Sequence, residues 1–108
     1  MDLTEVKHFE QQQVGKLKLS DAMRIGARIR PQCRGSYKSA GRSCALGAVF
    51  EAVYGRPSDS SERVDTLLEK QFPELKKGRS WLGSKIVDLN DAGWTRERIA
   101  DWLESKGL

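Results

Sequence analysis

The chain has 108 residues and a formal net charge of +4, and 31% of its residues are charged while 38% are hydrophobic. This length fits one domain, and the hydrophobic fraction excludes an intrinsically disordered chain. The longest uncharged apolar stretch, residues 44–50, is far shorter than the roughly twenty residues of a transmembrane helix, so the composition excludes a membrane-spanning segment.

Residues 1–16 precede the first clear helix signal, and we expect them to form a flexible arm ahead of a single helical domain, residues 17–108. The N-terminus has charged residues but neither an apolar run nor a small-residue cleavage site, which argues against a secretory signal and predicts a cytoplasmic protein. Its two cysteines, Cys33 and Cys44, should then stay reduced. With one histidine, Cys and His alone cannot supply a four-ligand zinc site, and we predict no metal and no cofactor.

The first predicted helix begins at Ser20, a favourable N-cap residue, and ends before Pro31. Arg24 and Arg28 are four residues apart and therefore share one face of this helix. The apolar residues at helical spacing define another face, which we expect to be buried: Ala22, Ile25, Gly26 and Ile29.

The next predicted helix, residues 43–54, is apolar nearly all round and should form the buried centre of the fold. Its Gly47 and Ala48 allow another helix to approach closely. Three further helices follow in the sequence. Asp59 and Glu62 are spaced as a capping box before the first of them, which ends at Pro73.

The last two predicted helices follow Ser80 and Thr95, which are both favourable N-cap residues. Gly93 is expected to end the earlier of the two in a left-handed conformation. Strand signals are nearly absent from the chain. The sequence therefore predicts a compact all-α domain of about five helices around the buried central helix, residues 43–54.

Three blocks of the sequence, taken in order, resemble a family of small uncharacterised bacterial proteins: Leu19–Gln32, Ser43–Ala48 and Asp88–Trp102. The resemblance covers roughly residues 17–104 and implies a shared helical domain without an assigned activity. Family members often have a zinc-binding Cys-x-x-Cys pair between the second and third blocks. This chain has no cysteine there.

The positive charge of the chain is concentrated in residues 22–50. This segment has five arginines, one lysine and no acid, whereas the remaining 13 basic and 15 acidic residues give a net charge of −2. The loop after Pro31 leads to a helix N-terminus, where free N–H groups favour an anion. Guanidinium groups bind phosphates and carboxylates, and a tyrosine ring offers a stacking face. The predicted anion-binding residues are Arg24, Arg28, Arg34, Tyr37, Lys38 and Arg42.

These features predict a non-enzymatic accessory protein that contacts an anionic partner, either nucleic acid or an acidic protein, through a basic helix and loop. A solvated loop whose charges serve only solubility is the simplest alternative. A second hypothesis is a protein-interaction module, such as an inhibitor or a subunit of a larger assembly, with an exposed apolar or tryptophan-containing face. A third is a thiol-dependent enzyme, because the start of a helix and the neighbouring Arg42 both favour a thiolate at Cys44.

Overall fold

The computed structural model describes residues 17–36, 38–39, 41–59, 62–76 and 82–108, so the expected arm at 1–16 lies outside the described residues. Most of these residues are helical, which confirms the all-α prediction. The α-helices are α2 (Leu19–Ala27), α3 (Ala45–Tyr54), α4 (Val64–Gln71), α5 (Leu82–Asp91) and α6 (Arg96–Ser105). A short 3₁₀ helix, η1 (Pro73–Lys76), follows α4, and two short antiparallel strands, β1 (Lys38–Ser39) and β2 (Arg42–Ser43), lie in the loop before α3.

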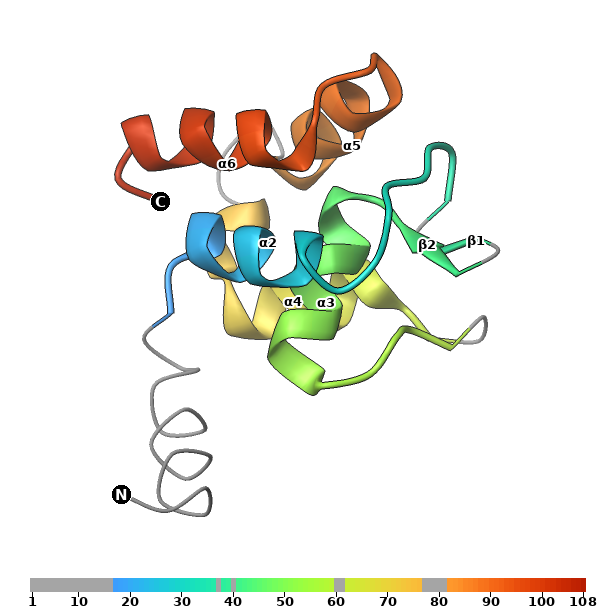
Figure 1. The fold of residues 1–108 in the computed structure, drawn as a ribbon. Coiled ribbons are helices and arrows are strands. Elements are labelled where there is room, and N and C mark those ends of the chain that lie inside the picture. The colour runs from blue at the N-terminus through green and yellow to red at the C-terminus, as the bar shows by residue number, and fades with distance from the viewer. Residues whose placement is uncertain (1–16, 37, 40, 60–61, 77–81) are drawn as a thin grey trace, which may run out of the picture.

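Helix α3 is the centre of the fold, as the apolar sequence predicted. Every residue from Ala45 to Glu51 is buried, and the helix contacts α2, α4 and α5 (Figure 1). It starts two residues later than predicted, because Ser43 belongs to β2 and Cys44 is the N-cap. Gly55 ends the helix in a left-handed conformation with φ 73°, which a residue with a side chain rarely adopts.

Helix α2 lies between α3 and α6 (Figure 1) and crosses α3 at very close range. A Cβ atom at Gly26 would stand only 1.8 Å from the carbonyl oxygen of Ala48, so no side chain fits between the two backbones. This contact fixes which face of α2 is buried. The buried residues of the helix are Leu19, Ser20, Ala22, Met23 and Gly26.

The prediction that Ile25 and Ile29 face the core is wrong, because their exposed fractions are 42% and 48%. Leu19 and Met23 take their place in the core, since α2 must bury its surface against α3 and α6 together. The predicted Ser20 N-cap is wrong as well. Lys18 is the N-cap, and Ser20 is buried in the first turn, where its N–H donates to the carbonyl oxygen of Leu108 at 3.2 Å.

The turn before α4 contains one contact of the predicted capping box, the bond to the Glu62 carboxylate, but the turn precedes the start of the helix. The N–H of Asp59 donates to Oε1 of Glu62 at 2.6 Å, and the N–H of Glu62 donates to the carbonyl oxygen of Asp59 at 3.0 Å. The helix itself starts at Val64 with Arg63 as N-cap, so these bonds close the preceding turn. Pro73 follows α4, as predicted, and begins η1.

Helix α6 begins as predicted. Thr95 is its N-cap, and Oγ1 accepts a hydrogen bond from the N–H of Arg98 at 3.1 Å. Gly93 has φ 104°, the left-handed turn predicted after α5, whereas the N-cap expected at Ser80 lies outside the described residues.

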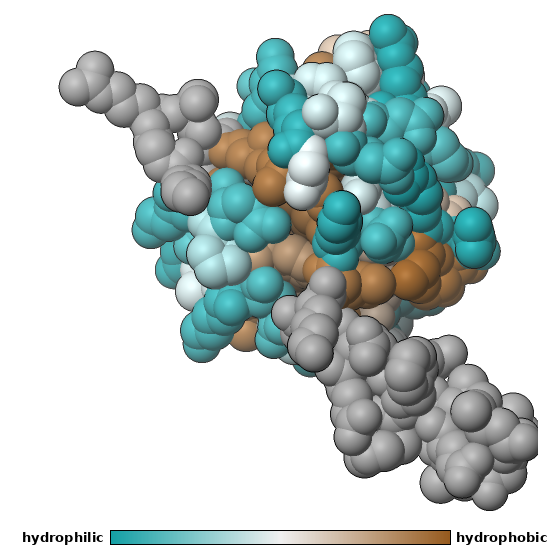
Figure 2. Space-filling view, turned by 90° about the vertical axis from the view of Figure 1, so that its left-hand side faces the viewer, coloured by the Kyte–Doolittle hydropathy of each residue, from teal (hydrophilic) through white to brown (hydrophobic). Residues whose placement is uncertain are grey.

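Figure 2 shows hydrophobic residues reaching the surface between hydrophilic ones, on the side of the molecule where α2 begins and α6 ends. Within the described part of the chain, no helix is long and apolar enough to cross a bilayer.

Candidate anion-binding surface

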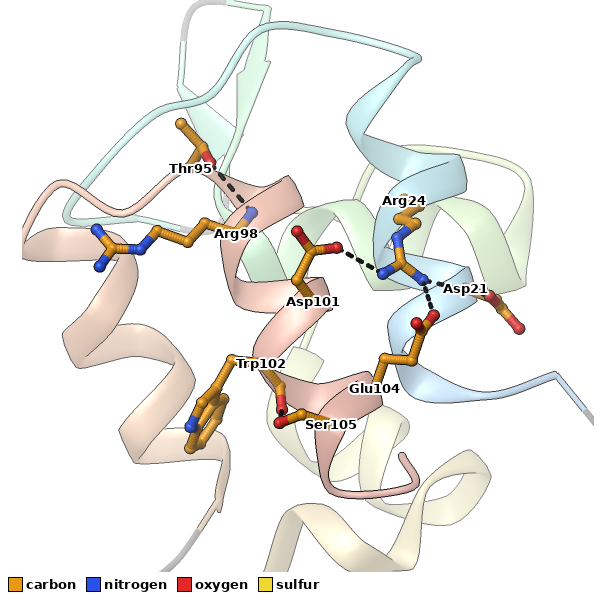
Figure 3. A network of polar contacts seen from close by, with 8 residues as sticks. All are labelled: Asp21, Arg24, Thr95, Arg98, Asp101, Trp102, Glu104 and Ser105. Atoms are coloured by element: carbon orange, nitrogen blue, oxygen red, sulfur yellow. Dashed lines mark hydrogen bonds and ion pairs between the residues drawn. The ribbon is translucent and has the colours of Figure 1, made fainter.

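Arg24 forms ion pairs with carboxylates of α6 (Figure 3). Its Nη2 lies 2.7 Å from Oδ1 of Asp101 and its Nη1 lies 2.8 Å from Oε1 of Glu104, while Asp21 is 3.6 Å away on the same helix. Hydrogen bonds to Asp101 and then Glu104 are the main causes that raise the pKa of Arg24. Because its charge is balanced within the molecule, we remove Arg24 from the predicted surface.

Arg30, which also belongs to the basic segment, is paired as well. Its Nε and Nη2 donate to the two carboxylate oxygens of Glu51, both at 2.7 Å, in a bidentate arrangement. Glu51 is only 5% exposed, so this pair connects the end of the α2 region to the buried helix α3. Arg30 therefore has a structural role.

Three of the predicted residues remain available to a partner. Arg28, Arg34 and Arg42 are exposed and form no ion pair with any residue that the structure describes. A terminal nitrogen of Arg34 lies 3.9 Å from the position that a Cβ of Gly93 would occupy, which places this guanidinium beside the turn between α5 and α6. We call these three residues the basic surface.

The other two predicted residues are only partly described. Lys38 lies in β1, where its backbone pairs with Ser43, but its side chain is outside the described part of the structure. Tyr37 is also outside the described residues. The carboxylate of Asp91 reaches the same loop, where its Oδ1 accepts from the N–H of Gly35 at 2.9 Å.

The loop between α2 and α3 holds Arg34 and Arg42 of the basic surface, and it is fixed by Arg96, the first residue of α6, which is only 4% exposed. Its Nη1 donates to Oγ and the carbonyl oxygen of Ser43 at 2.9 and 3.2 Å. Its Nη2 donates to the carbonyl oxygens of Ala27 and Arg30 at 3.3 and 2.8 Å. Burial lowers the pKa of Arg96. Since Ala27 ends α2, the buried cation also lies where a helix dipole favours positive charge.

Sequence reasoning missed Arg96, although a signal was present. A cation in the first turn of a helix is unfavourable, because the N-terminus already has partial positive charge. An arginine directly after the N-cap Thr95 therefore indicates that its side chain is engaged elsewhere, here with the carbonyl oxygens at the far end of α2.

Asn90, at the end of α5, is the second anchor of the loop and is 1% exposed. Its Oδ1 accepts from Nε2 of Gln32 at 2.8 Å and from the N–H of Ala45 at 3.0 Å, and its Nδ2 donates to the carbonyl oxygen of Cys33 at 2.9 Å. The expectation of free N–H groups at the start of α3 is therefore corrected. Asn90 and the thiol of Cys44 occupy two of these groups, those of Ala45 and Gly47.

Cys44 does not have the environment of an activated thiol. It is 6% exposed, and burial is the main cause that raises its pKa to about 11. Its Sγ accepts a hydrogen bond from the N–H of Gly47 at 3.4 Å, so the side chain serves as the N-cap of α3. Cys33 is also buried, with an exposed fraction of 8%, and its Sγ donates to the carbonyl oxygen of Ser36 at 3.3 Å.

A pocket of about 210 Å³ adjoins Cys44. It opens between the loop, the start of α3 and the end of α5. Among its polar side chains, Asn90 is already hydrogen-bonded to the loop and to α3, and Asp91 accepts from the N–H of Gly35. The lining residues are Gly35, Ser36, Cys44, Ala45, Leu46, Val87, Asn90 and Asp91. Within the described ranges, no group of three His, Cys, Asp or Glu side chains is placed to hold a metal ion.

The tryptophans of the described chain are partly covered by cations. The guanidinium of Arg98 lies 3.8 Å from the ring centroid of Trp94, and Nζ of Lys106 lies 5.0 Å from that of Trp102. Both rings also pack against the core. These cations and the packing leave less of both rings open to a partner, which argues against the tryptophan-containing face of the second hypothesis.

Comparison with family models, with curated proteins and with solved structures finds no match for this chain. The resemblance to small bacterial proteins accordingly stays a prediction, and the function must be argued from the geometry.

Proposed function

We propose that this protein is a non-enzymatic binding module that recognises an anionic partner through Arg28, Arg34 and Arg42, with Tyr37 and Lys38 of the same loop. The observation that carries the proposal is a difference among neighbouring cations. Arg24 and Arg30 are paired with carboxylates, whereas the three arginines of the basic surface have no such partner among the described residues.

The scaffold behind the loop supports this role. Arg96 and Asn90 hold the loop at Ser43 and Cys33, so these two points of its backbone are fixed before a partner arrives. Ordering in advance lowers the entropy that association must remove. A guanidinium presents a planar fork of donors that matches a carboxylate or a phosphate, and this geometry favours arginine over lysine.

The environment of Cys44 supports a binding role over thiol catalysis. A thiol with a pKa of about 11 has little thiolate at neutral pH, and the buried Sγ already accepts a backbone hydrogen bond. The carboxylates and cations near it serve to fix the loop and α3.

A salt titration tests the proposal. We expect binding of a heparin oligosaccharide, used as a polyanion probe, to weaken as ionic strength rises. The triple variant Arg28→Ala, Arg34→Ala, Arg42→Ala should reduce the slope of log K against log salt by about 2, since each lost contact to a flexible anionic strand removes roughly 0.7. Isothermal titration calorimetry at several salt concentrations measures both quantities.

The matched control removes the same charge elsewhere, through Lys70→Ala, Lys76→Ala and Lys85→Ala, all exposed. This control should keep most of the slope. Equal losses for the two triple variants would show that net charge alone attracts the anion, and the proposal of a specific surface would then be abandoned.

A further inference from the structure

The last turn of α2 and the residues that follow it expose both apolar and basic side chains. Ile25 and Ile29 are the exposed large hydrophobic residues of the described chain, with exposed fractions of 42% and 48%. Ile25 belongs to α2, whereas Ile29 lies in the turn that follows the C-cap Arg28, where its N–H donates to the carbonyl oxygen of Gly26 at 3.1 Å. Arg28 lies between them in the sequence, is exposed, and has no ion pair within the described ranges. We call Ile25, Arg28 and Ile29 the α2 ridge.

The rest of the helix explains why the α2 ridge is left open. Leu19, Met23 and Gly26 face α3 and α6, and the Gly26 backbone contact prevents the helix from turning its isoleucines inward. The other arginine of the helix, Arg24, is held by α6. The open face therefore presents two branched apolar side chains and one unpaired cation.

We propose that the α2 ridge is the docking site for an amphipathic helix of a protein partner, whose apolar side chains pack on Ile25 and Ile29 and whose Asp or Glu pairs with Arg28. This inference rests on the proposed function and specifies its partner as an acidic protein. One face of a partner helix offers apolar groups and an acid together, which complements the two isoleucines and the cation of the ridge.

Charge and polarity distinguish this occupant from two others. A nucleic acid backbone offers phosphates to Arg28 but gives isoleucine side chains no apolar surface to bury against. A second copy of this chain, joined by a two-fold contact centred on so small a patch, would bring two Arg28 guanidinium groups together. An acidic amphipathic helix satisfies both the apolar groups and the cation.

Site-specific photo-crosslinking of the full chain in its native host tests this assignment. Ile29 is replaced by p-benzoylphenylalanine, which keeps an apolar side chain at a half-exposed position. We expect a discrete protein adduct whose crosslinked peptide, identified by mass spectrometry, is an amphipathic helix with Asp or Glu. Adding Arg28→Glu should lower the adduct yield at least fivefold, and adding Ile25→Ser should also lower it.

The control carries the crosslinker at Lys85, an exposed residue of α5, and should give no corresponding adduct. Any of four outcomes would overturn the inference. These are a nucleic acid adduct, an adduct of two copies of this chain, a crosslinked peptide without acids, and an adduct yield no higher than that of the control. Circular dichroism checks that each variant is folded. In a folded variant, a lost adduct shows that the substituted side chain contributes to partner binding.

The heparin titration separates the two proposals. The double variant Ile25→Ser, Ile29→Ser should keep its heparin affinity within twofold of the natural chain. The same variant should lose the protein adduct, which is detected in this case with a crosslinker placed at Lys18. If heparin binding proves independent of the basic surface but the adduct keeps its dependence on Arg28, the roles proposed for Arg34 and Arg42 fail, while the contact at Arg28 and the inference that rests on it stand. If heparin binding behaves as expected and no adduct forms, only the inference fails.

Discussion

At the residue scale, Arg96 shows how a buried cation can be accommodated without a carboxylate. Its two terminal nitrogens are hydrogen-bonded to carbonyl and hydroxyl oxygens of Ala27, Arg30 and Ser43. These bonds join α6 to the end of α2 and to the loop with the basic surface. Burial opposes the charge and lowers the pKa of Arg96, so the hydrogen bonds must offset the cost of desolvation.

Replacing Arg96 by Met should destabilise the protein by about 2–4 kcal/mol, because several buried oxygens lose their donor. Chemical denaturation measures the free energy of unfolding. Arg98→Met on the same helix is the matched control and should cost less than about 1 kcal/mol, since Arg98 is exposed and its contact is the ring of Trp94. Similar losses in both variants would contradict the role assigned to Arg96.

At the element scale, the helices whose ends follow local rules were predicted best. Thr95 and Gly93 have the roles that N-cap and left-handed turn residues usually have, and the apolar run of α3 indicated its burial. The buried face of α2 was predicted correctly for Ala22 and Gly26 but wrongly for Ile25 and Ile29, because the isoleucines fit a helical repeat as well as Leu19 and Met23 do. Only the close contact with α3 decides between these faces, and that contact is tertiary.

The close contact between α2 and α3 predicts that a glycine-to-alanine substitution in α2 changes stability in the direction opposite to the usual one. Alanine normally stabilises a helix relative to glycine by roughly 1 kcal/mol. Gly26→Ala should instead destabilise the protein by about 2 kcal/mol or more, since the new Cβ meets the backbone of Ala48, which cannot move aside as a side chain can. Thermal and urea unfolding measure the change.

The neighbouring substitution Ala27→Gly serves as the comparison for this crossing. It should cost only about 1 kcal/mol, the ordinary helix-propensity loss. A Gly26→Ala variant as stable as the natural chain, or more stable, would show that α2 can retreat from α3.

At the scale of the whole molecule, the sequence predicted the segregation of charge but not its partial neutralisation. Asp101 and Glu104 lie 77 and 80 residues after Arg24, and Glu51 lies 21 residues after Arg30. No local spacing rule relates such distant residues, because their pairing depends on how α6 and α3 pack against α2. Of the predicted arginines, those of the basic surface stay exposed after the helices have packed.

Releasing Arg24 should extend the anion-binding surface. In the double variant Asp101→Asn, Glu104→Gln, the two α6 carboxylates that hold Arg24 become neutral, and Asp21, at 3.6 Å, is left as its remaining acidic neighbour in the described structure. We expect heparin to bind more tightly, with a salt slope larger by about 0.7 for one added contact. Glu69→Gln with Glu74→Gln, which removes the same charge from α4 and η1, is the control. An equal increase in the control would attribute the effect to net charge.

The contact between Gly26 and Ala48 has one more consequence. With no side chain as a spacer, the two helices cannot slide or tilt without a collision of their main chains. The α2 ridge is therefore held by a rigid pair of helices. Any conformational change during complex formation must then occur in the partner. A segment that becomes helical only on arrival would suit such a receptor, and its association rate would report its own folding.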